Sequence, residues 1–177
     1  MKLTFKHVSI QFILAISTIL YVSTATADDC KIDVSGSDMM RFDTKEINID
    51  KNCKKFEITL KHSGKLPINA MGHNIVFLET KNLQKIISKI NMSHGVENGY
   101  LSEMEEVLFK SKMIGGGQET KLELDTSVFV KGGDYTFICS FPGHFALMKG
   151  KLNIKKNPHS LKNKPTDGIY WFNLKHI

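Results

Sequence analysis

The strongest constraint on the fold is a short-range alternation of apolar and polar residues that recurs along the chain. Apolar side chains stand at every second position in short stretches separated by Gly, Asn and Asp. A period of two with such breaks is typical of half-buried β-strands. The pattern predicts an all-β domain, a sandwich or barrel. Its stretches are Ile32/Val34, Ile47/Ile49, Phe56/Ile58/Leu60, Leu122/Leu124, Tyr135/Phe137 and Leu152/Ile154.

One segment departs from this period. From Glu79 to Asn91 the apolar residues stand at i, i+3, i+4 and i+7, which is the spacing of one helix face. These residues are Leu83, Ile86, Ile87 and Ile90. We therefore expect one short α-helix inserted in the β domain.

The first 27 residues have the three parts of an export signal. Lys2 and Lys6 precede an apolar stretch, residues 10–22, and small residues end the segment at Ala27. We expect cleavage after Ala27, release of a soluble chain and a periplasmic location. The alternative is an uncleaved anchor helix, which the short length and polar residues of the stretch disfavour.

The pattern of charged and apolar residues argues against nucleic acid as a partner and against a membrane span in the mature chain. The whole chain has a net charge of +6, and residues 1–27 hold two lysines and no acid, so the remaining chain carries +4. No run of Arg and Lys alternates with aromatic residues, as nucleic-acid binding would require. After residue 27, no span is long and apolar enough to cross a bilayer. We expect no nucleic-acid partner and no membrane span in the mature chain.

Composition divides the mature chain into two parts. Residues 28–155 hold all the alternating stretches and are long enough for one domain with its own core. Residues 156–177 begin with Lys and Pro residues and end near the aromatic run Tyr170–Phe172. We expect a flexible C-terminal extension. The alternative is that the aromatic run docks on the domain or on a partner.

The chain has an odd number of cysteines, Cys30, Cys53 and Cys139. In an oxidising compartment this count indicates one disulfide and one thiol with a separate role. Cys30 and Cys53 are close in sequence and flank a hairpin-like stretch, so we expect them to pair. Such a bond stabilises the fold by roughly 3 kcal/mol in the chain-entropy model. Cys139 is then either a buried inert thiol or a ligand.

The neighbourhood of Cys139 favours a ligand. In the segment Cys-Ser-Phe-Pro-Gly-His-Phe-Ala-Leu-Met, Cys139, His144 and Met148 are close enough for one loop to aim them at a common point. Thiolate, imidazole and thioether are soft donors, which favour copper. His73 begins another strand-like run and can supply a second imidazole. Any one of these residues alone is more often an ordinary histidine or a core methionine, but the four together predict a copper site.

These segments and the early cysteine pair resemble those of the azurins, which are type 1 blue copper proteins of the cupredoxin family. The match runs from Cys30 to Lys155. The resemblance implies a Greek-key β-sandwich or barrel with one mononuclear copper. It also implies that His73, Cys139 and His144 are the equatorial ligands, with Met148 as a long axial ligand. The carbonyl oxygen of Gly72 would be a distant fifth contact.

The resemblance implies further roles around the site. Asn74 would link the two ligand loops, and its backbone would donate to the Cys139 sulfur. An apolar collar would form the docking surface for partners, made of Met40, Leu66, Met71, Met92, Phe141, Ala146 and Leu147. This chain departs from the family at Ile75, where some azurins have a buried tryptophan, and at Phe145, which replaces a small residue. We expect altered core packing at the first position and an altered docking surface at the second.

The remaining histidines are expected not to bind metal. His62 matches a family position near the site but outside the ligand set. No partner at ligand spacing accompanies His94, His159 or His176.

The resemblance implies a monomeric electron-transfer protein that cycles one copper between Cu(II) and Cu(I). Its partners would be redox proteins such as c-type cytochromes or periplasmic reductases. We expect no enzymatic activity, because catalytic copper needs further histidine pairs that this chain lacks. The alternative is a copper carrier or storage protein of the same fold. A further alternative, a binding domain of this fold without a metal, is disfavoured because it would not need all four ligands.

Overall fold

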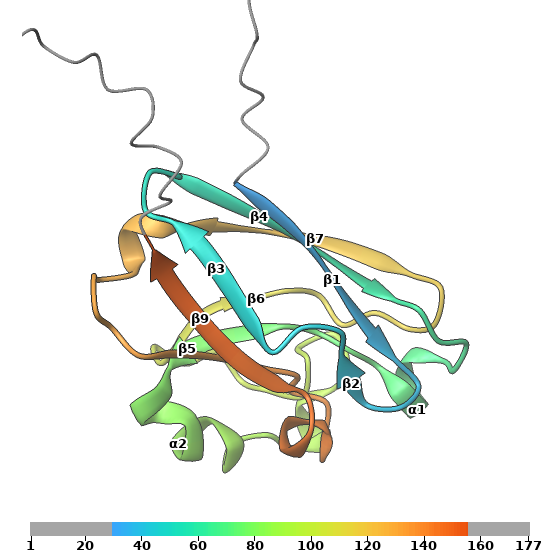
Figure 1. Ribbon diagram of the computed structural model, residues 1–177. Helices are drawn as coiled ribbons and strands as arrows, with labels where there is room; N and C mark the ends of the chain where they lie inside the picture. Colours follow the sequence, from blue (N-terminus) through green and yellow to red (C-terminus); the bar gives the residue numbers. More distant parts are fainter. Residues whose placement is uncertain (1–29, 156–177) are drawn as a thin grey trace, which may run out of the picture.

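The computed structural model describes residues 30–155, which form a sandwich of two β-sheets (Figure 1). The four-stranded sheet has the order β2 (Arg41–Phe42), β1 (Lys31–Ser37), β4 (Lys55–His62) and β7 (Glu119–Asp125). The five-stranded sheet has the order β3 (Glu46–Asp50), β9 (Lys149–Lys155), β8 (Tyr135–Ile138), β5 (Val76–Glu79) and β6 (Val107–Lys110). The pairs β1/β4 and β3/β9 are parallel, and the other pairs are antiparallel. The all-β sandwich that the alternation predicts is confirmed.

The alternating stretches explain how the sheets face one another. In β4, Phe56, Ile58 and Leu60 are buried, and Phe56 lies opposite Leu124 of β7. Side chains at every second position of a strand point to one face of its sheet, so these residues line the space between the sheets. The main core therefore lies between the two layers and includes Cys139 and Met148.

Strand β5 is buried on both faces, which its sequence indicates by a continuous apolar run. Phe77 belongs to the main core between the sheets, whereas Val76 and Leu78 belong to a second apolar cluster. The second cluster lies under the inserted helix α2 (Leu83–Ile87), which contributes Ile86. In Figure 1, α2 lies outside the five-stranded sheet, at the lower left.

The inserted helix is shorter than its sequence pattern predicts. A 3₁₀ turn η1 (Thr80–Asn82) precedes α2, and after Ser88 the backbone hydrogen bonds change from i→i−4 to i→i−3, because the amides of Lys89 and Ile90 donate to the carbonyls of Ile86 and Ile87. The Ser88 hydroxyl donates to the carbonyl of Lys85, and the Asn91 amide donates to the carbonyl of Tyr100 rather than within the helix. The side chain of Ser88 and the returning loop thus replace the last predicted turns.

Further single turns lie in the loops of the described chain. They are α1 (Ile68–Met71), η2 (Met92–His94), η3 (Thr126–Val128) and η4 (His144–Ala146). Two of them, α1 and η4, stand beside the residues that the sequence marks as donors. Loops at one end of a rigid sandwich are a common place for functional residues.

At the opposite end of the sandwich, Cys30 and Cys53 form the expected disulfide, with Cα atoms 5.6 Å apart. It joins the start of β1 to the loop before β4. Among the described residues, no helix is long and apolar enough to span a membrane. The predicted signal segment, residues 1–27, and the C-terminal extension, residues 156–177, lie outside the described residues.

Candidate metal centre

The structure brings His73, Cys139 and His144 together, although four strands, β5 to β8, lie between His73 and Cys139 in the sequence. His73 stands just before β5, Cys139 follows the last residue of β8, and His144 begins η4. One nitrogen of each imidazole and the sulfur all lie within 4.8 Å of one another, and all three residues are buried. This spacing is suitable for a single bound ion.

The loop from Cys139 to Met148 is closed by its own backbone. The amide of Cys139 donates to the carbonyl of Met148 at 3.0 Å, and the amides of both Leu147 and Met148 donate to the carbonyl of His144. Gly143 has a φ of 85°, in the left-handed region that glycine enters without a Cβ clash. The loop is therefore a compact unit that presents its sulfur and imidazole to the same side.

The histidine on the other loop has one free buried nitrogen. Nε2 of His73 donates to the carbonyl of Ser37 at 2.9 Å, which leaves Nδ1 without a proton. Among the described residues, this Nδ1 is the buried side-chain nitrogen or oxygen that has no hydrogen-bond partner. Because an unpaired buried acceptor is costly, a bound cation is the partner that this atom fits.

The second imidazole, that of His144, also directs its Nδ1 toward Cys139. Nδ1 of His144 lies 3.8 Å from Sγ of Cys139, and the ring stacks on Phe141 with centroids 4.3 Å apart. Burial lowers the pKa of His144 to about 4 and also lowers the pKa of His73. Both rings are therefore neutral at pH 7, which is the form that binds a metal.

Cys139, unlike the two imidazoles, must lose a proton before it can bind a metal. Burial raises the pKa of Cys139 to about 11, although the backbone amides of Asn74 and Phe141 act in the other direction. Cys139 would bind a metal as the thiolate, and the positive charge of a bound cation would favour that deprotonated form. The two neutral imidazoles and the thiol thus suit a soft metal ion better than an organic ligand.

Asn74 joins the two donor loops through Ser140. The Asn74 side chain donates to the Ser140 hydroxyl at 2.8 Å and accepts from the Ser140 amide at 2.8 Å. The same hydroxyl donates to the carbonyl of Gly99. All these groups are buried, so the bonds fix the relative position of the residues that directly precede them, His73 and Cys139.

The two remaining expected donors lie beside this group. The carbonyl oxygen of Gly72 is 3.8 Å from Sγ of Cys139. Met148 is fully buried, and its methyl group approaches Gly36 together with the ring of His73. A Cβ at Gly36 would lie 2.6 Å from that ring, so only glycine leaves it room. The sequence pattern had not singled out Gly36.

The expected docking collar is partly exposed. Leu66, Met92 and Leu147 are 42%, 60% and 49% exposed, and Ala146 is exposed as well. Met40, Met71 and Phe141 are half-buried. Met39, which was not included, is 70% exposed beside Met40.

The two departures from the family pattern have different surroundings. Ile75 is fully buried in the main core. Phe145 is half-buried and packs against the second cluster, under α2. Its ring therefore anchors the donor loop to that cluster.

The other histidines lie in varied places. His62 stacks on His73, with ring centroids 4.2 Å apart and planes 7° from parallel. His94 ends η2, whereas His159 and His176 lie outside the described residues. Sequence reasoning missed the acceptor Ser37 and the linking residue Ser140. The signal for Ser140 was its place directly after Cys139, which matches that of Asn74 after His73.

Comparison with known proteins agrees with this geometry. Residues 28–155 match the family described as copper binding proteins, plastocyanin/azurin family. The azurin of Bordetella pertussis is 45% identical over 129 residues, which cover 72% of this chain and 85% of that protein. Azurin-1 of Alcaligenes xylosoxydans xylosoxydans is 43% identical over 71% of this chain and 98% of its own length.

A solved structure agrees as well. An azurin from the methylotroph Methylomonas sp. strain J superposes with a TM-score of 0.68 and 29% sequence identity, covering 72% of this chain and 98% of that chain. Together with the family match, this similarity confirms the cupredoxin fold and identifies copper as the metal of the centre. The chain belongs to the plastocyanin/azurin family of copper-binding proteins.

Proposed function

We propose that this protein transfers single electrons between redox partners by means of one copper held by His73, Cys139 and His144. The observation that carries the proposal is the buried Nδ1 of His73, which faces the other donors and has no hydrogen-bond partner among the described residues. When bound, copper supplies a centre that gains and loses one electron. The protein needs no substrate pocket for this task, and we propose no enzymatic activity.

Met148 and the carbonyl of Gly72 are proposed as the weaker ligands. Both lie at the edge of the His73, Cys139 and His144 group, and Met148 shares its backbone bonds with Cys139 and His144. A long axial thioether disfavours Cu(II) relative to harder ligands and tunes the reduction potential.

The rigidity of the donor loops suits electron transfer. Asn74, Ser140 and Gly99 form a buried hydrogen-bonded unit between the loops. Outer contacts of this kind keep ligands in place when the charge of a metal changes. Small movement of the ligands between the two oxidation states permits fast electron exchange.

The apolar collar is the proposed docking surface. Leu66, Met92 and Leu147 are exposed large apolar side chains of this collar, and the amide of Leu147 donates to the carbonyl of His144, which is itself 4% exposed. Such a patch is suited to brief encounters that bury little area. We propose that the partners are redox proteins such as c-type cytochromes or periplasmic reductases, and that the protein acts as a monomer.

The proposed location is the periplasm. The disulfide between Cys30 and Cys53 supports an oxidising compartment. The export signal predicted in residues 1–27 agrees with this location. Amino-terminal sequencing of the exported protein tests it, and a first residue other than Asp28 would contradict cleavage after Ala27.

Electron self-exchange between Cu(I) and Cu(II) protein tests the function. Fast exchange, measured by NMR line broadening in mixtures of the two forms, supports an electron carrier. Slow exchange with readily lost copper would contradict it and favour a copper carrier.

A docking variant tests the collar in the same assay. Leu147→Lys places a charge on the patch and should slow exchange about tenfold or more, because two like charges then meet at the contact. Val130→Lys is the matched control, because Val130 is 64% exposed but lies next to η3 and outside the collar. Equal rates for both variants would contradict docking through the collar.

A further inference from the structure

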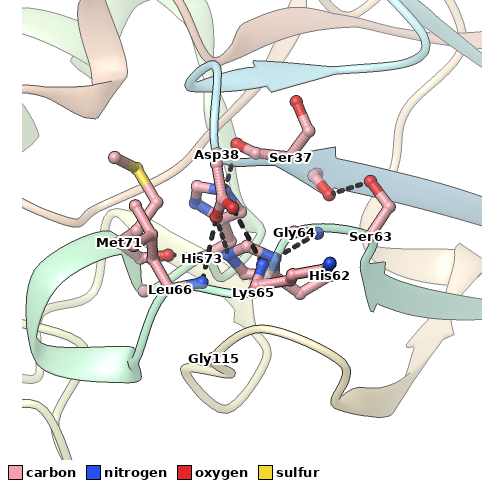
Figure 2. Close-up of polar contacts among 12 residues, drawn as sticks. Ser37, Asp38, His62, Ser63, Gly64, Lys65, Leu66, Met71, His73 and Gly115 are labelled. Atoms are coloured by element: carbon pink, nitrogen blue, oxygen red, sulfur yellow. Dashed lines mark hydrogen bonds and ion pairs between the residues drawn. The ribbon is translucent and has the colours of Figure 1, made fainter.

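The carbonyl that holds His73 belongs to a tight turn between β1 and β2. In this turn, residues 37–40, the amide of Met40 donates to the carbonyl of Ser37 at 3.0 Å. The same carbonyl accepts from Nε2 of His73 at 2.9 Å (Figure 2). Met40 has a φ of 52°, which a residue with a Cβ rarely adopts. The orientation of the His73 ring thus depends on this turn, and the strained turn must itself be stabilised by contacts with neighbouring residues.

Asp38 connects this turn to a second segment. Its carboxylate accepts from the amide of Lys65 at 2.8 Å and from the amide of Leu66 at 3.3 Å. A Cβ at Gly64 would lie 2.1 Å from the carboxylate, so only glycine permits this approach. Figure 2 shows Asp38 above Lys65 and Leu66, with both bonds drawn.

Segment 63–66 in turn fixes the ring that stacks on His73. The amide of Gly64 donates to Nδ1 of His62 at 3.0 Å, which assigns the proton of the neutral ring to Nε2. Nε2 then donates to the carbonyl of Met71 at 2.8 Å. The His73 ring is therefore contacted at its edge by the turn and on its face by His62.

We propose that Asp38 is a positioning residue for the metal centre: its carboxylate locks the turn 37–40 to segment 63–66 and so fixes the ring of His73. The carboxylate also carries a negative charge, and its Oδ1 lies 3.9 Å from Nε2 of His62, the ring that stacks on His73. A fixed negative charge stabilises Cu(II) more than Cu(I) and lowers the reduction potential. This inference rests on the proposed electron-transfer function.

Removal of the carboxylate leaves other bonds between the same segments. The amide and the hydroxyl of Ser63 both bind the carbonyl of Gly36, at 2.8 and 2.9 Å. The amides of Gly116 and Gly117 also hold this segment, through the carbonyls of Leu66 and His62. Variants of Asp38 are therefore expected to fold.

Two variants separate position from charge. Asp38→Asn removes the charge but keeps one carbonyl oxygen for the Lys65 amide, whereas Asp38→Ala removes both. Asp43→Asn is the matched control. Asp43 also accepts a hydrogen bond from a backbone amide, that of Ser35 at 3.0 Å, and its replacement by asparagine removes the same charge. Among the hydrogen bonds of the described residues, Asp43 has none to segment 63–66.

Amide hydrogen exchange in the copper-free protein reports the position. In Asp38→Ala, the amides of Lys65 and Leu66 should exchange about tenfold faster or more, as expected for the loss of a bond to a charged group. In Asp43→Asn, both rates should equal those of the wild type. Unchanged exchange in Asp38→Ala would overturn the positioning role.

The copper-loaded protein reports the charge and the ring geometry. Both Asp38 variants should have a higher reduction potential than Asp43→Asn, and Asp38→Ala should also change the copper EPR spectrum, with Asp38→Asn between it and the wild type. If the potentials and spectra of both Asp38 variants equal those of Asp43→Asn, the role of Asp38 is overturned but the proposed electron-transfer function is not. A wild type without a blue absorption band would instead overturn the proposed function, while amide exchange would still decide the positioning role.

Discussion

At the end of the sandwich where β1 begins, a disulfide joins Cys30 to Cys53, whereas the opposite end is held by hydrogen bonds between loops. The disulfide end buries no group of metal donors among the described residues, and its neighbours include exposed lysines. The donor end buries polar side chains, including His62, His73 and Asn74. Both ends connect the same two sheets, but by different means.

The difference separates stability from geometry. A disulfide acts mainly by restricting the unfolded chain, so it adds stability without setting the position of distant side chains. Buried hydrogen bonds add less net stability but require specific positions, and leaving one partner unpaired is costly. We therefore expect changes at the disulfide end to alter unfolding alone, and changes at the donor end to alter the copper spectrum as well.

The largest loss of stability is expected from the disulfide. Replacement of Cys30 and Cys53 by serine should lower the free energy of unfolding by about 3 kcal/mol, because the bond closes a loop with a sequence separation of 23. Chemical denaturation of the two proteins measures this change. The visible spectrum of the copper protein should stay the same, and a shifted spectrum would show that the two ends are not independent.

The next largest effect is expected at Asn74. Asn74→Ala leaves the buried amide of Ser140 without its acceptor and should cost about 2 kcal/mol. It should also shift the reduction potential, since the two donor loops lose their link. Ser111→Ala is the control, because the Ser111 hydroxyl accepts from the amide of Ile75 at 3.0 Å and, among the hydrogen bonds of the described residues, makes none to the loop of Cys139. A potential shift as large in the control would contradict a special role for Asn74.

A smaller loss of stability is expected at Phe145. Phe145→Ala removes a half-buried ring from the second cluster and should cost about 1–2 kcal/mol. It should also speed the loss of copper to a chelator, because the donor loop loses its anchor. Phe109→Ala removes a ring that is also half-buried, but packs against the main core, and serves as the control. The contact is not an anchor if both variants release copper at the same rate.

Local patterns predicted more of the fold than of the site. Alternation identified the strands because one face of each is buried, and Cys139, His144 and Met148 were predicted as metal donors because they share one loop. The inserted helix was predicted too long, since the pattern cannot show that Ser88 and Tyr100 compete for its last hydrogen bonds.

Contacts across space were harder to predict. Ser37 and Asp38 are small polar residues in a turn, and nothing near them in sequence indicates that they meet His73 and segment 63–66. Gly36 and Gly64 are required by side chains that approach from other strands and loops. Such roles follow from packing, so one sequence does not reveal them.

The visible absorption spectrum of the wild type after addition of Cu(II), measured beside that of Cys139→Ser, tests the central claim most directly. The bond between copper and the Cys139 thiolate predicts an intense blue band for the wild type and a colourless variant. Circular dichroism verifies that both proteins are folded. A folded, copper-loaded wild type without the blue band would contradict a copper centre formed by His73, Cys139 and His144.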